Sequence, residues 1–155
     1  MTEIALISLD ADDAQIAQDF GRSFETYGFA MIENHGLDPA LIARAWELTA
    51  QFFALPEETK RRFFDANIAG ARGYTPFKTE IAKGAAHHDL KEFWHVGRTL
   101  PADSPLKSSM PDNIWPDEPA DFKAVFAQLW DDFDALGVRL LSYIATYLGL
   151  DTEWF

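Results

Sequence analysis

The residues with the clearest potential for metal chemistry are His87, His88 and Asp89, which follow one another directly. Read as His-x-Asp, His87 and Asp89 supply two ligands of the two-histidine, one-carboxylate face that holds iron(II) while leaving coordination positions open. The third ligand must come from elsewhere, and the candidates are His35 and His95, since no histidine follows His95. Because such a tripeptide arises often by chance, we favour solvated loop histidines over a metal site.

A second arrangement uses His88, Glu92 and His95, which fall at positions i, i+4 and i+7. On a helix these three side chains would share one face. Phe93 and Trp94 favour a strand instead, and a strand would place Glu92 and His95 on opposite faces. A metal-binding face is therefore expected here only if the stretch is helical.

A glycine-punctuated, mixed-charge stretch begins at Arg72-Gly73-Tyr74-Thr75. It continues through the charged residues Lys78, Glu80, Lys83, Asp89, Lys91 and Glu92. The simpler interpretation is a surface loop with weak ion pairs, which add little stability. The functional interpretation is the rim of a pocket, because loops of this kind place polar groups near ligands. From the residues alone we favour the surface loop.

Composition and charge exclude several classes of function. The 155 residues carry 25 acidic and 13 basic side chains, a net charge of −12, which disfavours nucleic acid and anionic membranes as partners. There is no cysteine, and no apolar run approaches the length of a membrane span. Phosphate-binding loops, nucleophile elbows and dinucleotide fingerprints are also missing. We expect a cytoplasmic protein.

The first elements expected to position these residues are a strand at 4–9 and a helix that follows it. Asp10 is the predicted N-cap, and Ile16, Phe20, Phe24 and Tyr27 form the apolar stripe of the helix. Gly28 suits the left-handed residue that ends such a helix. The next strand, at 29–34, begins apolar on both faces, so we expect it to be covered on both sides.

Three further helices are expected. One starts at Asp38-Pro39 and ends near Leu55, and a short one then runs to Phe64. The region 67–118 is rich in loops, with only 92–96 resembling a strand. The last helix, 119–149, has Pro119 in its first turn and would be roughly 45 Å long. The chain then stops at two large apolar residues, which we interpret as a cut.

These elements predict an α+β fold, rich in helices, with a few short strands and one long scaffold helix. We expect one domain, 1–155, made of a strand-helix-strand-helix unit (1–66), a loop-rich segment (67–118) and the long helix (119–149). Separated strands with apolar faces need partners that this chain does not supply. Self-association through exposed strands is therefore a further expectation.

Five sequence blocks, in order, resemble the N-terminal region of the iron(II)- and 2-oxoglutarate-dependent oxygenases. The resemblance is greatest to the branch that contains isopenicillin N synthase and the plant flavonoid, gibberellin and ethylene-forming enzymes. The blocks are L-I-S-L-D at 6–10, Y-G-F-A-M-I-E-N-H-G at 27–36, F-F-A-L-P-E-E-T-K at 52–60, the G-Y, E, K-G and D-L-K-E residues between 73 and 92, and N-I-W-P at 113–116.

The resemblance implies that His35 belongs to a structural turn and that Asp89 and Glu92 serve the fold. It places the iron ligands and an Arg-x-Ser motif further along, in a double-stranded β-helix (jelly roll) that the strands of this chain would join. No Arg-x-Ser occurs here. The resemblance thus implies no catalytic, cofactor-binding or metal-binding residue in this chain, and a substrate-pocket role for Arg72, Tyr74 and Thr75.

The function expected is that of an N-terminal domain which shapes the scaffold and one pocket wall. The parent oxygenase would use iron(II), dioxygen and 2-oxoglutarate to oxidise a small molecule, whereas the 155-residue chain alone would bind neither cofactor and be inactive. The alternative is a free-standing, non-catalytic binding module with the same fold. The substrate is left open, because pocket walls differ among oxygenases of one fold.

Overall fold

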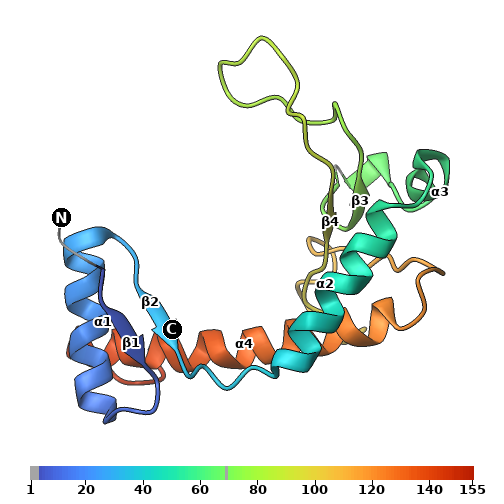
Figure 1. The fold of residues 1–155 in the computed structure, drawn as a ribbon. Helices are drawn as coiled ribbons and strands as arrows, with labels where there is room; N and C mark the ends of the chain where they lie inside the picture. The colour runs from blue at the N-terminus through green and yellow to red at the C-terminus, as the bar shows by residue number, and fades with distance from the viewer. Residues whose placement is uncertain (1–3, 69) are drawn as a thin grey trace. The chain divides into compact units, whose positions relative to one another are not determined.

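The computed structural model of the chain describes residues 4–68 and 70–155. Its elements are β1 (Leu6–Ser8), α1 (Asp13–Tyr27), β2 (Met31–Glu33), α2 (Pro39–Phe53), α3 (Glu57–Arg61), a 3-10 turn (Ala66–Ile68), β3 (Gly73–Thr75), β4 (Phe93–His95) and α4 (Phe122–Tyr147) (Figure 1). By spatial contact the chain divides into two compact units. Unit 1 takes in the N-terminal part up to Asp38 together with Asp131–Phe155, and unit 2 is Pro39–Trp130. The units are defined by contacts in space, whereas the predicted sections 1–66, 67–118 and 119–149 are continuous blocks of sequence, so those sections stay a prediction.

Helix α1 of unit 1 has both of its ends capped. Asp12 is the N-cap, and its side chain accepts a hydrogen bond from the Ala14 N–H at 3.0 Å. The predicted cap, Asp10, was wrong by two residues, because a turn at Leu9 and Asp10 and a bend at Ala11 precede the first helical turn. At the other end Gly28 adopts φ 77°, as predicted, and its N–H donates to the Phe24 carbonyl at 2.9 Å.

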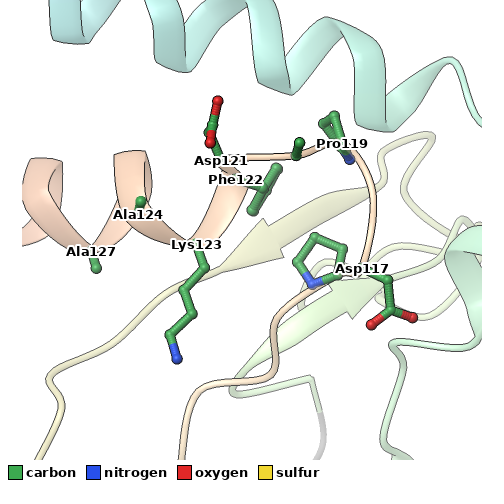
Figure 2. Close-up of a pocket in the computed structure, with 9 residues that line it drawn as sticks. Asp117, Pro119, Asp121, Phe122, Lys123, Ala124 and Ala127 are labelled. Atoms are coloured by element: carbon green, nitrogen blue, oxygen red, sulfur yellow. The ribbon is translucent and has the colours of Figure 1, made fainter.

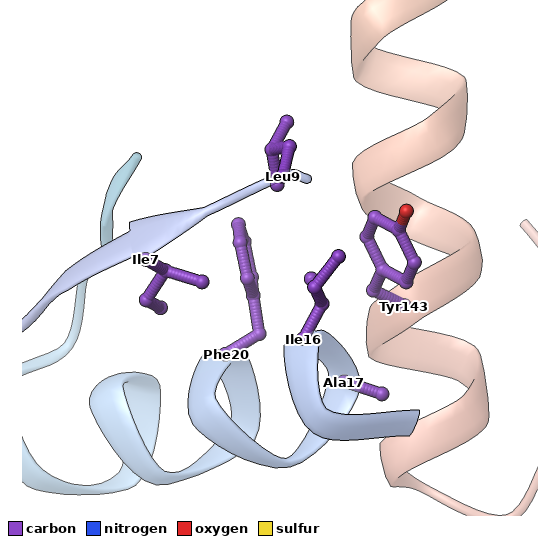
Figure 3. Close-up of a cluster of buried hydrophobic side chains, with 6 residues drawn as sticks. All are labelled: Ile7, Leu9, Ile16, Ala17, Phe20 and Tyr143. Carbon is purple, nitrogen blue, oxygen red and sulfur yellow. The ribbon is translucent and has the colours of Figure 1, made fainter. Parts of the chain in front are cut away.

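Strands β1 and β2 pair in parallel, with Leu6 opposite Met31 and Ser8 opposite Glu33. Their inner face packs on α1 and α4 through the buried residues Ile7, Leu9, Ile16, Ala17, Phe20 and Tyr143 (Figure 3). On β2 only Ile32 and the preceding Ala30 pack against this cluster, while Met31 is 47% exposed. The prediction that this strand is covered on both sides is therefore wrong for this chain, since Met31 on the outer face is nearly half exposed.

Arg139 and Tyr143 tie α4 to the rest of unit 1 through polar contacts. Arg139 donates to the Leu9 carbonyl at 2.8 Å and to the Tyr143 hydroxyl at 2.9 Å. Tyr143 in turn donates to Asp13, in the first turn of α1, at 2.9 Å. These bonds join residues 130 positions apart in sequence, so they fix α4 against both the strand and the helix of unit 1.

Unit 2 is built around Phe52, which comes from α2 and is fully buried. Its ring makes edge contacts with Tyr74 of β3 and Trp94 of β4, with centroids 5.9 and 4.8 Å away. Strands β3 and β4 are antiparallel, with Tyr74 opposite Trp94. Strand β3 was missed from the sequence, because it has only three residues and begins with a glycine at φ 74°.

Helix α4 is the longest element, with 26 residues, or about 39 Å. It begins at Phe122, and the prediction that Pro119 lies in its first turn was wrong by three residues. Asp121 has φ 66°, a left-handed conformation that cannot belong to the helix, so the helix starts after it.

The observed fold is α+β, as the sequence predicted, with four helices and four short strands among the described residues, one strand more than expected. Within residues 4–68 and 70–155, no helix is long and apolar enough to cross a membrane.

Candidate functional site

The centre of unit 2 contains a buried ion pair between Lys60, at the end of α3, and Glu92, just before β4. Lys60 is only 6% exposed, and its ammonium group donates to both carboxylate oxygens of Glu92, at 2.9 and 2.8 Å. A third bond goes from Lys60 to the Phe53 carbonyl at the end of α2, at 3.2 Å. One ammonium group thereby joins α2, α3 and the start of β4.

Tyr74 of β3 completes this polar network. Its side chain is fully buried, and its hydroxyl donates to Oε2 of Glu92. Burial, and then the hydrogen bond to Glu92, raise the pKa of the Tyr74 hydroxyl far above its usual value. Tyr74 therefore remains a neutral donor, because ionisation would place two negative charges side by side in a region with little water.

Arg72 precedes β3 and has few partners. Its Nη1 donates to the Ala71 carbonyl, 2.6 Å away, and its Nε is buried without a partner among the described residues. The guanidinium lies against the backbone of Gly97, where an added Cβ would be 2.2 Å from Cζ of Arg72. Gly97 therefore makes room for Arg72, and the fork of the guanidinium is paired with no carboxylate in the part of the chain described.

Thr75 ends β3 and is 1% exposed. Its Oγ1 is buried without a partner in the described residues, close to Gly70, whose added Cβ would be 2.5 Å from that oxygen. The three residues predicted to line a pocket thus lie close together in and just before β3. Tyr74 is engaged by Glu92, whereas Arg72 and Thr75 each keep a polar atom without a partner.

A cavity of about 320 Å³ borders the ion pair. Its wall is almost entirely apolar, apart from Glu92 and Thr49, and consists of Thr49, Phe53, Glu92, Phe93, Trp94, Val96, Phe122 and Phe126. Arg72, Tyr74 and Thr75 are not among its lining residues, although β4, which contributes Phe93 and Trp94, is paired to β3. Lys60, Phe53 and Trp94 were not identified as site residues from the sequence, because only the folded chain brings Lys60 to Glu92 and packs the two aromatic residues into one cluster.

A shallower hollow of about 410 Å³ lies around the start of α4 (Figure 2). Both carboxylates there face arginines: Asp117 lies 3.2 Å from Arg62, and Asp121 lies 3.7 Å from Arg44. Both carboxylates are exposed and already paired with an arginine, so neither is positioned to bind a ligand.

The histidines differ in their surroundings, and the contacts of His35 and His95 go to different backbone groups. His35 accepts from the Leu37 N–H at 3.1 Å, which is the turn role that the resemblance implied. His95 contacts the Gly70 carbonyl at 2.8 Å, and His87 and His88 are exposed. Asp89 lies 3.4 Å from Lys91.

The donor groups that the structure describes do not fit an iron(II) site. Among residues 4–68 and 70–155, no three His, Asp or Glu side chains come together closely enough to hold a metal ion.

Comparison with known proteins identifies the family. A sequence profile described as "non-haem dioxygenase in morphine synthesis N-terminal" matches residues 3–118. Flavanone 3-dioxygenase 2 of Oryza sativa subsp. japonica is 33% identical over 141 residues, which are 90% of this chain and 38% of that enzyme. Hyoscyamine 6-dioxygenase of Hyoscyamus niger is 28% identical over 99% of this chain and 45% of that enzyme.

Solved structures show the same relationship. A Caulobacter crescentus protein assigned to the 2OG-Fe(II) oxygenase family superposes over the whole chain with a TM-score of 0.90 and 44% identity, and the match covers 52% of that protein. A full-length Neurospora crassa protein, solved in complex with alpha-KG, gives a TM-score of 0.79 at 28% identity, over 98% of this chain and 49% of that protein. The chain thus spans about half the length, or less, of these relatives. It belongs to the N-terminal domain family of the 2-oxoglutarate- and iron(II)-dependent non-haem dioxygenases.

Proposed function

We propose that this chain is the N-terminal domain of an iron(II)- and 2-oxoglutarate-dependent oxygenase that oxidises a small molecule. The domain supplies the α4 scaffold and one wall of the substrate pocket, and the second half of the oxygenase holds the metal and the cosubstrate. The enzyme acts in the cytoplasm. The single observation that carries this proposal is the match of the whole chain to about half of an oxygenase-family structure at 44% identity.

The donor chemistry of the chain supports this division of roles. Its described residues do not gather three metal ligands, and its buried charged pair, Lys60 with Glu92, is saturated by internal bonds. When bound, iron(II) and 2-oxoglutarate would supply the oxidising chemistry. The residues of this chain would position the substrate and exclude water from one side of it.

The polar member of the pocket wall is Arg72, with Tyr74 and Thr75 beside it. Arg72 presents a rigid, planar fork that matches a carboxylate or another acceptor pair on a substrate. The guanidinium of Arg72 is held in position, because it lies against Gly97 and its Nη1 donates to the Ala71 carbonyl. Tyr74 contributes by fixing β3 through Glu92, and Thr75 is buried beside it with a hydroxyl that has no partner among the described residues.

Steady-state kinetics of the full-length oxygenase test the pocket role. Arg72→Ala is expected to raise the KM for the prime substrate about ten- to a hundredfold, because a charge-assisted hydrogen bond is lost. The affinity for 2-oxoglutarate should stay nearly unchanged. Arg62→Ala, which removes an exposed arginine of unit 2 that pairs with Asp117, is the matched control and should leave both constants unchanged. Equal kinetics of the Arg72→Ala variant and the wild type, at unchanged melting temperature, would remove Arg72 from the pocket.

A further inference from the structure

The N-I-W-P block at 113–116 is one of the five blocks that carry the resemblance, and no role has yet been given to it. It lies in unit 2, in the connection that leads to α4. Ile114 and Trp115 pack against the buried cluster around Phe52. Asn113 directly precedes them, so the core holds the backbone from which its side chain extends.

The side-chain amide of Asn113 binds the backbone of Gly97 in both directions. Its Oδ1 accepts from the Gly97 N–H at 2.8 Å, and its Nδ2 donates to the Gly97 carbonyl at 2.7 Å. A longer contact, of 3.4 Å, joins Nδ2 to Oγ1 of Thr99. The β3–β4 ladder ends at the pair Gly73–His95, two residues before Gly97. Asn113 therefore supplies the donor and the acceptor that a neighbouring strand would otherwise provide.

Gly97 is the residue against which the guanidinium of Arg72 lies. An added Cβ on Gly97 would be 2.2 Å from Cζ of Arg72 and 2.3 Å from its Nη2. The φ angle of Gly97 is outside the left-handed region, so space, and not backbone conformation, requires a glycine here. The position of the Gly97 backbone thereby sets where the guanidinium can lie.

The same block also reaches the backbone next to Arg72. An added Cβ on Gly73 would be 3.0 Å from Cβ of Ile114, so Ile114 covers the residue that follows Arg72. Arg72 has little hold of its own: Nη1 donates to the Ala71 carbonyl, and Nε is buried without a partner among the described residues. Its orientation depends on the surface that Asn113 and Ile114 keep in place.

We propose that Asn113 is a positioning residue for Arg72. By fixing Gly97 through two hydrogen bonds, it holds the guanidinium fork ready for an acceptor pair on the substrate. The inference rests on the proposed function, because it takes Arg72 as part of the pocket wall. A side chain that is already ordered loses less conformational freedom on binding, so the contribution of Asn113 is made through Arg72.

The test measures how fast phenylglyoxal, a reagent for guanidinium groups, modifies Arg72 in the full-length oxygenase, with the modified peptide followed by mass spectrometry. Asn113→Ala removes both bonds to Gly97 and should speed the modification of Arg72 about two- to tenfold, because the guanidinium is released. Gly97→Ala leaves the amide of Asn113 unchanged but puts a methyl group where the guanidinium lies. It should speed the modification at least as much, and it decides the matter if Asn113→Ala does not fold.

Two controls separate positioning from a general loss of structure. Arg62, whose side chain is 63% exposed in the same unit, is modified in the same sample and should keep its rate. Asp112→Ala removes an exposed carboxylate that pairs with Lys107, one position before Asn113, and should leave the Arg72 rate unchanged. An Arg72 rate that neither variant changes, or that rises only together with the Arg62 rate, would overturn the inference.

Benzoate, with benzamide as its neutral counterpart, probes the carboxylate class at saturating 2-oxoglutarate. In the wild type, benzoate should slow the modification of Arg72 and benzamide should not. Asn113→Ala should then require about two- to tenfold more benzoate for the same protection, and an unchanged requirement would count against the inference. Failure of benzoate to protect the wild type would instead remove a carboxylate from the proposed role of Arg72, while the modification rates still decide whether Asn113 positions it.

Discussion

At the scale of single residues, the ion pair of Lys60 and Glu92 is the feature on which unit 2 depends most. Removing one partner of a buried pair leaves the other charge without compensation. We expect Glu92→Leu to lower the free energy of unfolding by about 3–5 kcal/mol, measured by urea denaturation. The double variant with Lys60→Met should recover most of this loss, because no unpaired charge then remains.

The exposed pair of Arg61 and Glu57, 2.6 Å apart, is the control for that prediction. Since both side chains are at least half exposed, Glu57→Leu should cost less than about 1 kcal/mol. If Glu92→Leu were no more destabilising than Glu57→Leu, the buried pair would have no special role in stability.

The hydroxyl of Tyr74 leads to a prediction about alkaline pH. Its pKa is raised in the folded chain, chiefly by burial and then by Glu92, whereas an unfolded tyrosine titrates near the usual value of about 10. Above that pH the unfolded chain loses this proton and the folded chain keeps it. The stabilising contribution is therefore complete below about pH 10 and falls as pH rises further, by about 1.4 kcal/mol per pH unit.

Urea denaturation between neutral pH and strongly alkaline pH measures this effect. Tyr74→Phe should be less stable than the wild type at neutral pH, by about 1–3 kcal/mol, because Glu92 loses a donor. The variant should also lose less stability as the pH rises above about 10. Tyr147→Phe is the comparison variant. The pKa of Tyr147 is also raised, mainly by a hydrogen bond to Glu25, so the stability of this variant is measured over the same pH range as that of Tyr74→Phe. Parallel curves for the Tyr74→Phe variant and the wild type would contradict the assignment.

The sequence foresaw some of these residues and missed others for a physical reason. Asp89 and Glu92 were assigned to the fold by resemblance, and the bonds from Lys60 and Tyr74 give Glu92 that role. Lys60 was not foreseen, because it pairs with a residue 32 positions away, and only the folded chain brings them together. The pocket role of Arg72, Tyr74 and Thr75 stays a prediction.

At the scale of elements, apolar periodicity predicted every long helix, and the errors lie at helix ends: at the starts of α1 and α4, and at the end of α3, which stops at Arg61 and not at Phe64. A helix start depends on the backbone angles of one or two residues, as at Asp121, whereas the body depends on a repeated pattern. The three-residue strand β3 has no period at all and was not predicted. Gly28, which ends α1, was correct because few residues other than glycine adopt its conformation easily.

The N-cap of α1 gives a prediction at this scale. Asp12→Ala removes the acceptor of the Ala14 N–H and is expected to cost about 1 kcal/mol of stability, measured by thermal or urea denaturation. Asp10→Ala removes the same charge two residues earlier and should change stability by less than about 0.5 kcal/mol. Equal losses for the two variants would mean that charge, and not the capping bond, is responsible.

At the scale of the whole molecule, the two units differ in how they are stabilised. Unit 2 is nearly neutral in sequence and holds ion pairs such as Lys60–Glu92 and Lys91–Glu80. Unit 1 carries almost all the net charge and packs through Ile7, Phe20 and Tyr143. Self-repulsion in a charged body opposes its compact state, so the apolar packing of unit 1 has to offset it.

The last prediction concerns the catalytic capacity of the chain by itself. An iron(II) site of the oxygenase kind needs two histidines and a carboxylate on one face. Here His35 is engaged in a turn, His95 contacts a backbone carbonyl, and Asp89 pairs with Lys91. We therefore expect the 155-residue chain neither to bind iron(II) tightly nor to turn over 2-oxoglutarate. Anaerobic titration calorimetry with iron(II), and an assay of succinate formation, measure the two properties. A micromolar iron site that His87→Ala abolishes would contradict the prediction and would support His87 and Asp89 as iron ligands.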